Sequence, residues 1–438
     1  MTPNILFLLA DDLGWGDVGY HGAPIDTPNL DRLARGGVEL DRHYVCPVCT
    51  PTRAALLSGR HPGRFGGHAT HPTNAPVLPD GLLTLPGMLR GAGYRTGLFG
   101  KWHLGSAPEY FPGRYGFDAS YGSLAGGVDP YLHRYKRGEF SRTWHRDGEP
   151  IDERGHVTDL ITDAAVEWIG RDDRPWFCYL PFTAVHTPIR PPEAWLDRYA
   201  GRAFDDDPAR DRSFRAYAAY ASHMDAAVGR VVEALKCLDQ LDNTLIIFAS
   251  DNGAPTSNPA RDTALYPGVY DDTPRLGSNA PLRGGKNTLY EGGIRTPAVV
   301  SWRNRLAARR LDAPLHIVDW MPTFAALLGL TPPADAGWDG ANIWPLLAGE
   351  RADPPERTLY WSLRGVETYA VRRGAWKLIV RHPGADETRE LYHLDDDPLE
   401  TRDHLGDAPK TAAALRAALD DHRRLDDTAV CAAMRTEG

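Results

Sequence analysis

Long apolar stretches are missing from this sequence: no run approaches the roughly 18 residues that a membrane-spanning helix needs. The N-terminal stretch MTPNILFLLADD also lacks a basic region and a small-residue cleavage site, so it is predicted to form a strand and not a signal peptide. We therefore expect a cytoplasmic protein that does not bind membranes. The alternative is a protein whose secretory leader has been trimmed from the chain.

Cysteine is also scarce, with five residues in a chain of 438. An odd, sparse number in a chain of this length argues against the disulfide framework of small secreted domains. Cys46 and Cys49 are spaced like half of a zinc site, but no second Cys/His pair follows at the spacing of a zinc finger. Structural zinc is therefore not expected. The other cysteines are Cys178, Cys237 and Cys431.

Positive charge is in deficit, since 58 acidic and 49 basic residues give a formal net charge of −9. This balance argues against a nucleic-acid-binding protein, and any anionic substrate must be held by a local group of basic residues. With 42% hydrophobic and 24% charged residues, the composition is ordinary for a globular enzyme. The length suggests about two or three domains, or one large core with a smaller satellite.

Short apolar runs alternate with helical patterns through most of the chain. Helical periodicity covers residues 156–171 and 214–238, and Thr27 is the expected N-cap of another helix in TPNLDRLARGG. Strands that alternate with helices predict an α/β fold, with a large, mostly parallel, doubly wound sheet flanked by helices. The predicted buried strands are 4–10, 96–100, 175–182, 244–250 and 297–302.

The C-terminal part has a different pattern, because its strands follow one another without long helices between them. TLYWSL, YAVRRGAWKLIVR and RELYHL predict a small antiparallel sheet, which a helix near residues 408–424 closes. We therefore predict a large α/β domain at residues 1–345 and a smaller α+β subdomain at residues 346–438.

Charged and polar side chains follow the predicted strands where each strand ends. In an open parallel sheet the carboxyl ends of the strands share one edge, and ligands bind there. Two strands are followed by acids or an amide, and two by basic or imidazole groups. The residues are Asp11, Asp12, Asp251, Asn252, Lys101, His103 and His186.

The acidic strand ends point to a hard divalent cation. Neighbouring buried carboxylates repel each other, and each costs several kcal/mol unless it is paired. The candidate ligands are all oxygens, which suits calcium or magnesium and disfavours zinc. The alternative is that these residues only cap turns, as Asp and Asn often do after strands. Two acidic ends together with basic groups on other strands favour the metal site.

The stretch VCPVCTPTRAALLSG places a cysteine at the mouth of a helix. Pro51 suits the first helical turn, so Thr50 is the expected N-cap and Gly59 the end of the helix. Cys49 then immediately precedes the helix, where the dipole favours anions and lowers the pKa of a thiol. Arg53 lies one turn further. A plain thiol beside calcium or magnesium is a poor ligand, so another group would fit better at this position.

Several motifs resemble those of Cys-type, arylsulfatase-like sulfatases of the alkaline phosphatase superfamily. VCTPTRAALLSGR resembles the C-x-P-x-R signature, and GYRTGLFGKWHLG resembles the second signature. PNILFLLADDLGWGDVGYHG and IIFASDNG resemble the two metal-binding segments, and LRGGKNTLYEGGIRTP resembles the lysine loop. LYHLDDDPLE resembles the C-terminal strand and turn of these enzymes. The resemblance covers nearly the whole chain and implies an alkaline phosphatase-like fold.

The resemblance implies that Cys49 is converted to formylglycine by a formylglycine-generating enzyme. The hydrated aldehyde would present an oxygen to the metal, which removes the conflict between sulfur and a hard cation. Thr52 departs from the serine that the signature most often has, but it keeps the hydroxyl, so conversion is still expected. Cys46 is outside the signature and is interpreted as a passive thiol.

The resemblance also assigns roles to the remaining residues. One Ca²⁺, rather than Mg²⁺, would be bound by Asp11, Asp12, Asp251, Asn252 and an oxygen of the modified Cys49. Arg53 and Lys101 would stabilise the oxyanion of the hydrated aldehyde. His103 would be the base that lets sulfate leave. His186 and Lys286 would contact the sulfate and protonate the leaving alcohol.

The implied function is the hydrolysis of a small sulfate monoester, either an aryl sulfate or a sulfated sugar. One alternative is a phosphodiesterase or phosphonate monoester hydrolase of the same superfamily. Another is a catalytically silent module that binds sulfated glycans, although the complete residue set argues against it. The oligomeric state has no signal in the sequence.

The substrate pocket is expected to be walled by long loops rich in Gly, Pro and aromatic residues. Segments 104–150 and 254–290 are irregular, and loops of this length often form lids or binding walls. Within them, the wall is expected to come from residues near 104–146 and 254–280. Residues 60–74 are a third candidate. Individual candidate wall residues are Arg64, His68, His71, Trp144, His145 and Tyr270.

Overall fold

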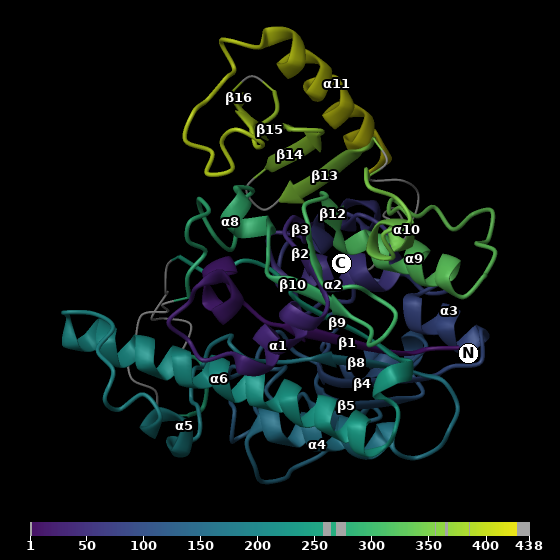
Figure 1. The fold of residues 1–438 in the computed structure, drawn as a ribbon, viewed down its shortest axis with the longest axis vertical. Coiled ribbons are helices and arrows are strands. Elements are labelled where there is room, and N and C mark those ends of the chain that lie inside the picture. Colours follow the sequence, from purple (N-terminus) through teal and green to yellow (C-terminus); the bar gives the residue numbers. More distant parts are fainter. Residues whose placement is uncertain are drawn as a thin grey trace.

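The computed structural model describes residues 2–256, 264–268, 277–354, 356–363, 367–384 and 386–426. Figure 1 shows a large body in which helices surround a central sheet, and above it a smaller part in which helix α11 (Pro409–Leu425) lies against a second sheet. The large sheet has ten strands and is parallel at its centre, and the C-terminal sheet has four antiparallel strands. The predicted α/β fold class is confirmed.

The large sheet has the strand order β11-β2-β10-β9-β1-β8-β4-β5-β6-β7. Its strands are β1 (Asn4–Ala10), β2 (Val38–Leu40), β4 (Arg95–Lys101), β5 (Ala119–Ser123), β6 (Trp144–Arg146), β7 (Glu149–Pro150), β8 (Trp176–Pro181), β9 (Thr244–Ser250), β10 (Ala298–Ser301) and β11 (Arg309–Leu311). β1 pairs in parallel with β8 and β9, and β4 pairs in parallel with β8 and β5. β10 runs antiparallel to β9, and β6 to β5. The four central strands β9, β1, β8 and β4 therefore end at one edge.

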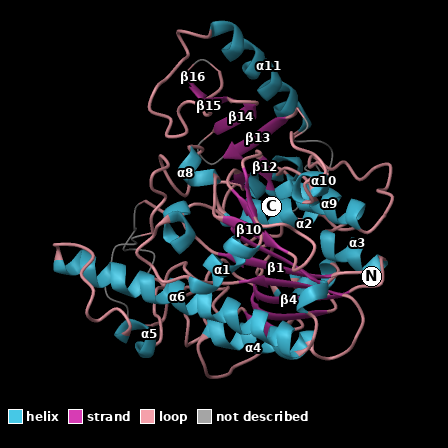
Figure 2. Cartoon of the chain, viewed as in Figure 1, coloured by secondary structure: helices cyan, strands magenta, loops and turns pink. Residues whose placement is uncertain are grey.

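Helices cover both faces of the large sheet (Figure 2). They are α1 (Pro28–Gly36), α2 (Cys49–Ser58), α3 (Leu85–Gly91), α4 (Val157–Ile169), α5 (Glu193–Asp197), α6 (Pro208–Cys237), α8 (Glu291–Ile294), α9 (Trp320–Leu327) and α10 (Trp344–Leu347). Short 3-10 helices span Trp15–Asp17, Gly19–His21, Pro62–Phe65, Gly67–Thr70, Pro108–Tyr110, Pro112–Tyr115, Leu241–Asn243 and Ile317–Asp319. The predicted helices after Thr27, at 156–171 and at 214–238 correspond to α1, α4 and α6, and the predicted helices that end at Gly59 and lie near 408–424 correspond to α2 and α11. α6 begins six residues before its predicted start, because Asp207 caps a polar first turn by accepting the N–H of Ala209.

Alternating side chains of each central strand build two separate cores. In β1, Phe7 packs in the cluster that includes α2, α3 and α9, whereas Leu8 packs in the cluster that includes α1, α4 and α6. Both side chains are fully buried. A strand covered on both faces is a nearly continuous apolar run, and NILFLLA has this form. This burial on both sides fixes the central strands and the positions of the residues that follow them.

The C-terminal sheet consists of β13 (Thr358–Leu363), β14 (Thr368–Arg373), β15 (Trp376–Arg381) and β16 (Thr388–His393). One face, with Val371 and Leu378, packs against Leu415 of α11. The other face, with Ile379, packs with Tyr44 of the large domain. Tyr44 belongs to a two-stranded sheet of β3 (His43–Tyr44) and β12 (Leu315–His316). The small sheet is therefore joined to the large body through a shared apolar cluster, and the boundary after residue 345 stays a prediction.

The prediction of irregular structure is wrong for part of residues 104–150. β5, β6 and β7 lie in this range and extend the large sheet beyond β4. These strands are short and contain Gly and Ser, as in ASYGS of β5, so no apolar run announces them. In the described parts of 254–290, by contrast, no strand or helix is present, as predicted.

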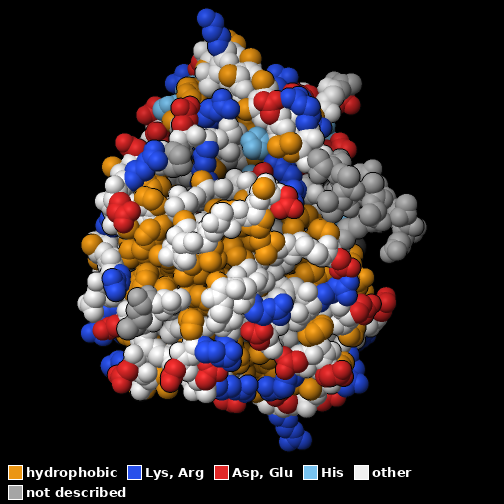
Figure 3. Space-filling model, turned by 90° about the vertical axis from the view of Figure 1, so that its right-hand side faces the viewer, with side chains coloured by type: hydrophobic (Ala, Val, Ile, Leu, Met, Phe, Trp, Pro, Cys, Tyr) orange, Lys and Arg blue, Asp and Glu red, His pale blue; other side chains and the backbone are white. Residues whose placement is uncertain are grey.

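One face of the molecule has a broad apolar area (Figure 3). In Figure 3 the area lies in the middle of this face, bordered by charged side chains of both signs. Among the described residues, the large apolar side chains that are exposed are Leu132, Leu238, Leu265 and Leu425, so most of this area belongs to partly buried side chains. No helix in the described part of the chain has the length and apolar character needed to span a bilayer.

Candidate active site

The central strands deliver the predicted residues to one edge of the sheet. Asp11 follows β1, Asp251 follows β9, and the two strands are paired up to Ala10 and Ser250. Lys101 was predicted to follow its strand, but it is the last residue of β4. These side chains are fully buried, although water normally surrounds such charges. Their burial is possible because opposite charges meet at this edge.

Asp11 and Lys101 form the first of three buried ion pairs. Nζ of Lys101 lies 2.6 Å from Oδ2 of Asp11, and both side chains are inaccessible to solvent. Burial raises the pKa of Asp11 to about 7; Lys101 opposes this rise, while Asp251 and Asp12 add to it. The second oxygen, Oδ1, is buried and has no hydrogen-bond partner among the described residues. The ion pair with Lys101 thus leaves one oxygen of this carboxylate without a hydrogen bond from the described residues.

Asp12 joins a lysine from a distant loop to the same cluster. Its Oδ1 lies 2.6 Å from Nζ of Lys286 and accepts a 2.7 Å hydrogen bond from Nδ2 of Asn252. The backbone of Asp12 is left-handed, with φ of 66°. Oδ1 of Asn252 is buried and has no hydrogen-bond partner in the described part of the chain. The amide oxygen therefore remains available as a ligand.

Arg53 and Asp251 form the third pair. Nε and Nη2 of Arg53 donate to Oδ2 of Asp251 at 3.2 and 2.8 Å, and Nη1 donates to the carbonyl oxygen of Lys101 at 2.8 Å. Oδ1 of Asp251 accepts the N–H of Asp12 at 3.1 Å. Burial lowers the pKa of Arg53, but Asp251 together with Tyr179 and Asp11 outweighs burial and holds the pKa above its ordinary value. The guanidinium is therefore a permanent cation that ties together the ends of β1, β9 and β4.

Helix α2 begins two residues earlier than predicted. Cys49 is its first residue and Val48 takes the N-cap position with an extended backbone, so the assignment of Thr50 as N-cap is wrong. The hydroxyl of Thr50 instead accepts the N–H of Thr73 at 3.3 Å. Gly59 ends the helix in the left-handed conformation, as predicted. Val48 has no polar side chain, which leaves the N–H groups of the first turn without a side-chain cap.

The expected lowering of the thiol pKa at the helix mouth is also wrong. Burial raises the pKa of Cys49 above its ordinary value, and the charges of Lys101 and Lys286 only oppose that rise. An unmodified thiol at position 49 is therefore mainly protonated.

Thr52 fixes the first turn of the helix, because its hydroxyl accepts the N–H of Cys46 at 3.0 Å and donates to the carbonyl oxygen of Asp251 at 2.6 Å.

His103 lies at the same edge in a left-handed backbone conformation, with φ of 58°. Its Nδ1 is buried and has no hydrogen-bond partner among the described residues. Burial, followed by the charges of Lys101 and Arg53, lowers its pKa well below the ordinary value. The imidazole is therefore neutral at pH 7 and can accept a proton.

His186 reaches the cluster from the loop after β8. Its Nδ1 donates to the carbonyl oxygen of Thr187 at 2.6 Å, which fixes the orientation of the ring. Nε2 lies 3.8 Å from Oδ2 of Asp12. Asp11, Asp12 and His186 form one of the groups in the described chain whose ligand atoms are close enough to hold a metal ion.

A cavity of about 580 Å³ opens above these residues. Cys49, His103, His186 and Lys286 line it, so the predicted nucleophile and three of the predicted polar groups face one space. Its other lining residues are Pro72, Thr73, Asn74, Gly126, Tyr135, Lys136, Pro255, Thr256, Tyr266 and Asn287. Each of the three segments expected to form its walls contributes, but through residues that the sequence did not single out. Isolated Tyr, Thr and Asn in loops carry no pattern from which they could have been predicted.

The residues predicted individually as wall residues do not line the cavity where the structure describes them. Arg64 is buried, and Trp144 and His145 are buried in β6. Nε1 of Trp144 donates to Glu153. His68 and His71 are half-buried and do not line the cavity. Tyr270 lies outside the described residues. A polar or aromatic residue in a loop near the site is thus a weak predictor of a wall position.

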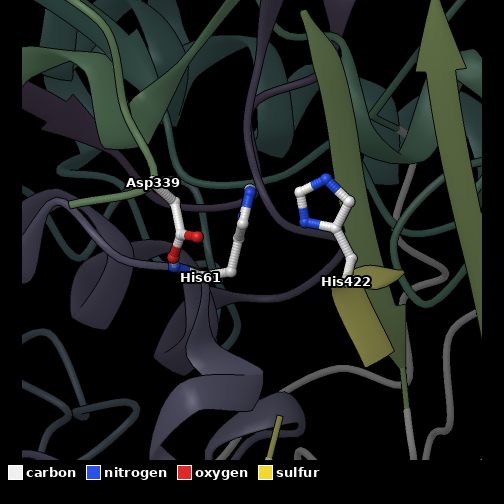
Figure 4. Close-up of side chains that lie close together, drawn as sticks. All are labelled: His61, Asp339 and His422. Atoms are coloured by element: carbon white, nitrogen blue, oxygen red, sulfur yellow. Dashed lines mark hydrogen bonds between the residues drawn. The ribbon is translucent and has the colours of Figure 1, made fainter. Parts of the chain in front are cut away.

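Arg64 instead holds a second cluster of metal-type ligands together. His61, Asp339 and His422 converge from three distant segments (Figure 4). Nη2 of Arg64 lies 2.8 Å from Oδ1 of Asp339 and 3.3 Å from Nδ1 of His422, and Nη1 lies 2.6 Å from Asp426. A guanidinium already provides the positive charge there. This cluster is therefore an ion-pair contact between the large domain and α11.

Comparisons with known proteins match most of the chain. Residues 3–330 match the sulfatase family, and residues 285–426 match the C-terminal region of N-sulphoglucosamine sulphohydrolases. The chain is 37% identical over 377 residues to human N-acetylgalactosamine-6-sulfatase, covering 81% of this chain and 67% of that protein. It is 33% identical over 460 residues to human arylsulfatase A, covering 92% and 83% of the two chains.

Solved structures agree in fold. The crystal structure of Ps i-CgsB in complex with k-i-k-neocarrahexaose is similar, with a TM-score of 0.83, 29% identity and coverage of 98% of this chain and 94% of that chain. The phosphonate monoester hydrolase of Agrobacterium radiobacter has a TM-score of 0.64 at 19% identity, covering 97% and 95%, which shows a common fold alone. The resemblance found in the sequence is thus confirmed. The chain belongs to the sulfatase family, as an arylsulfatase-like enzyme that hydrolyses sulfate esters.

Proposed function

We propose that this sulfatase hydrolyses small aryl or sugar sulfate monoesters with a formylglycine made from Cys49 and one bound Ca²⁺. The observation that carries the proposal is the convergence on one cavity of Cys49, His103, His186 and Lys286, above three buried carboxylates. This arrangement combines a position for a nucleophile, proton acceptors and donors, and cations for an anion.

The residues at the sheet edge fit a calcium ion. Asp11, Asp12, Asp251 and Asn252 offer only oxygen ligands, which calcium prefers, and their carboxylates are completely or almost completely buried. Oδ1 of Asp11 and Oδ1 of Asn252 are buried without a described hydrogen-bond partner, which natural proteins rarely tolerate. With an oxygen from position 49, these four residues would hold the ion. Mg²⁺ suits the site less well, because it usually keeps several waters.

The charge balance explains what the ion would add. The three carboxylates are matched by the three cations Arg53, Lys101 and Lys286, so the cluster alone is close to neutral. A bound Ca²⁺ would supply the excess positive charge that attracts a sulfate ester and stabilises the charge that develops during its hydrolysis. A neutral cluster without the ion would bind sulfate less well.

The surroundings of position 49 favour an oxygen nucleophile over sulfur. Burial raises the pKa of the Cys49 thiol, so little thiolate is available, and thiolates bind hard cations poorly. Formylglycine, when hydrated, supplies hydroxyl groups at the same place. The buried, doubly hydrogen-bonded hydroxyl of Thr52 keeps the first turn of α2 fixed. A threonine in the signature is thus compatible with the site.

The chain's own residues then have separate tasks. Lys286 and His186 line the cavity where the sulfate would lie, and one of them must deliver a proton to the alcohol oxygen as its bond to sulfur breaks. Neutral His103 can take a proton from the group at position 49 before inorganic sulfate departs. Arg53 and Lys101 hold the carboxylates in place and provide fixed positive charge.

A methyl group at Gly126 tests the role of His103. In a Gly126→Ala variant the added carbon would overlap Nε2 of His103 and lie 2.8 Å from its Cδ2, so the ring has to move. A displacement of about 1 Å in a catalytic group lowers rates by about 10²-fold. We expect kcat for 4-nitrophenyl sulfate to fall by about this factor, with nearly unchanged thermal stability. Gly36→Ala, with nothing near the added carbon, is the matched control; equal kcat in both variants would contradict the role.

Substrate competition tests the proposed reaction, because the fold is shared with a phosphonate hydrolase. We expect kcat/KM for 4-nitrophenyl sulfate to exceed that for the matching phosphate diester and phenylphosphonate monoester by at least about 10²-fold. A higher kcat/KM for either phosphorus ester would favour the alternative function. Sulfated mono- and disaccharides in the same assay would separate aryl from sugar preference.

A further inference from the structure

We propose that the C-terminal sheet positions Lys286, and that Lys377 and Arg283 are its positioning residues. Lys286 belongs to a loop, residues 283–291, here called the lysine loop. The inference rests on the proposed function, in which Lys286 contacts the sulfate. The lysine loop belongs to the large domain, but contacts with residues of the C-terminal part hold both of its ends.

The far end of the lysine loop is held by a buried lysine. Lys377 on β15 is inaccessible to solvent, and its Nζ lies 2.9 Å from Oε1 of Glu291 and 2.9 Å from Oε1 of Glu400. Both carboxylates are also buried. The contact of Lys377 with Glu291 is also a hydrogen bond, whereas Oε1 of Glu400 makes no hydrogen bond among the described residues. Removing one partner of a buried ion pair is strongly destabilising, so these charges hold the two parts of the fold together.

Glu291 has further contacts that make it a fixed point. Its backbone N–H donates to Oε2 of Glu400 at 2.7 Å, and its Oε2 accepts the hydroxyl of Tyr44 at 2.7 Å. Glu291 is the last residue of the lysine loop and the first residue of α8. The side chain and the backbone of this residue are thus both held by groups outside the loop.

The near end of the loop is held by Arg283. Its Nη1 donates to the carbonyl oxygen of Glu400 at 2.8 Å and to the hydroxyl of Tyr392 at 3.0 Å. The guanidinium also lies 4.0 Å from the ring centre of Tyr290. Glu400 is therefore bound to both ends of the lysine loop, through its carbonyl oxygen at one end and its carboxylate at the other.

The loop between these anchors connects directly to the catalytic cluster. The N–H of Gly292 donates to the carbonyl oxygen of Arg283 at 2.8 Å, which closes the loop. The N–H of Lys286 donates to Ala254 at 3.1 Å, and the N–H of Asn287 donates to Pro47, two residues before Cys49, at 3.0 Å. A shift of either anchor would therefore move Lys286, whose Nζ lies 2.6 Å from Oδ1 of Asp12.

A double-mutant cycle tests this positioning. Lys286→Ala is expected to lower kcat for 4-nitrophenyl sulfate by about 10²-fold, as loss of a group that binds developing charge does. Arg283→Gln, a change at an exposed residue, is expected to lower kcat by about 10-fold with a nearly unchanged melting temperature. In the Lys286→Ala background, Arg283→Gln should cause no further loss, because both changes remove the same interaction.

Two further variants complete the experiment. Lys377→Met should lower kcat per folded molecule, and it should cause no further loss of kcat in the Lys286→Ala background. This variant will also unfold at a lower temperature. Arg416→Gln removes an ion pair to Glu387 within the C-terminal part and should leave kcat unchanged. Unchanged kcat in Arg283→Gln, or an equal fractional loss with and without Lys286, would overturn the inference. Full activity of Lys286→Ala would instead overturn the proposed role of Lys286, so the two failures are distinguishable.

Discussion

Replacing Cys49 with alanine is expected to lower kcat for 4-nitrophenyl sulfate by at least about 10⁴-fold, the scale on which loss of a nucleophile acts. Alanine can neither be converted to formylglycine nor supply an oxygen. The residual rate would come from Lys286 and His186, which still line the cavity where the sulfate would lie. Single-turnover and steady-state rates with the purified variant would measure the loss. Activity within about 10-fold of the parent protein would contradict the assignment of the nucleophile.

Cys46 provides the matched control. It lies three residues away and is also buried, and burial raises the pKa of its thiol to about 12, so it is chemically inert. We expect Cys46→Ala to retain kcat within about 2-fold, since no proposed step uses this thiol. A Cys49→Ser variant should give one turnover and a stable sulfate ester, because serine has no second hydroxyl whose proton could be removed. Continued turnover by the serine variant would argue against the proposed release step.

Replacing Asp251 with asparagine is expected to lower the free energy of unfolding by about 3–5 kcal/mol, because Arg53 would remain buried without its partner. The same variant should bind Ca²⁺ at least about 10-fold more weakly, since a proposed ligand loses its charge. Urea denaturation in calcium-free buffer measures the first effect, and calorimetric titration with Ca²⁺ measures the second. The two measurements separate the ion pair from the metal site.

Asp242→Asn is the matched control for this substitution. Asp242 forms an ion pair with Arg303 at 3.2 Å, but both side chains are about 60% exposed. Exposed pairs contribute about 0–1 kcal/mol, so this variant should lose less than about 1 kcal/mol and keep its Ca²⁺ affinity. If Asp251→Asn lost no more stability than Asp242→Asn, the buried pair would not be a main support of the site.

The sequence predicts the central fold because burial on two faces leaves a strong pattern. NILFLLA and TLIIFAS are nearly continuous apolar runs, and both are strands of the sheet centre. The acids that follow them lie together for a geometric reason: strands that run in parallel end at the same edge. The sequence alone therefore predicted that Asp11 and Asp251 lie close together.

The edge of the sheet and the pocket wall were not predictable in the same way. β5 to β7 are short and contain small or polar residues, so no apolar periodicity distinguishes them from loops. Tyr135 and Lys136 line the cavity only because the segment after β5 folds back over the site. Such tertiary placement leaves no local signal in the sequence.

Two errors about α2 have specific physical causes. Thr50 has the composition of an N-cap, but its hydroxyl bonds to Thr73 from the neighbouring loop and the helix begins before it. The helix mouth was expected to lower the thiol pKa of Cys49, but complete burial outweighs the nearby lysines. Arg64 gives a third example, because an arginine near the site pairs with Asp339 and Asp426 across the contact with α11.

Mass spectrometry of the peptide that spans Cys49 is the most direct test of the central claim. The protein should be produced together with a formylglycine-generating enzyme and shown to be active on 4-nitrophenyl sulfate. The proposed function predicts that the peptide has the lower mass expected when the CH₂–SH group becomes an aldehyde, and that it reacts with a hydrazide probe. Active protein in which Cys49 is a fully unmodified thiol would contradict it.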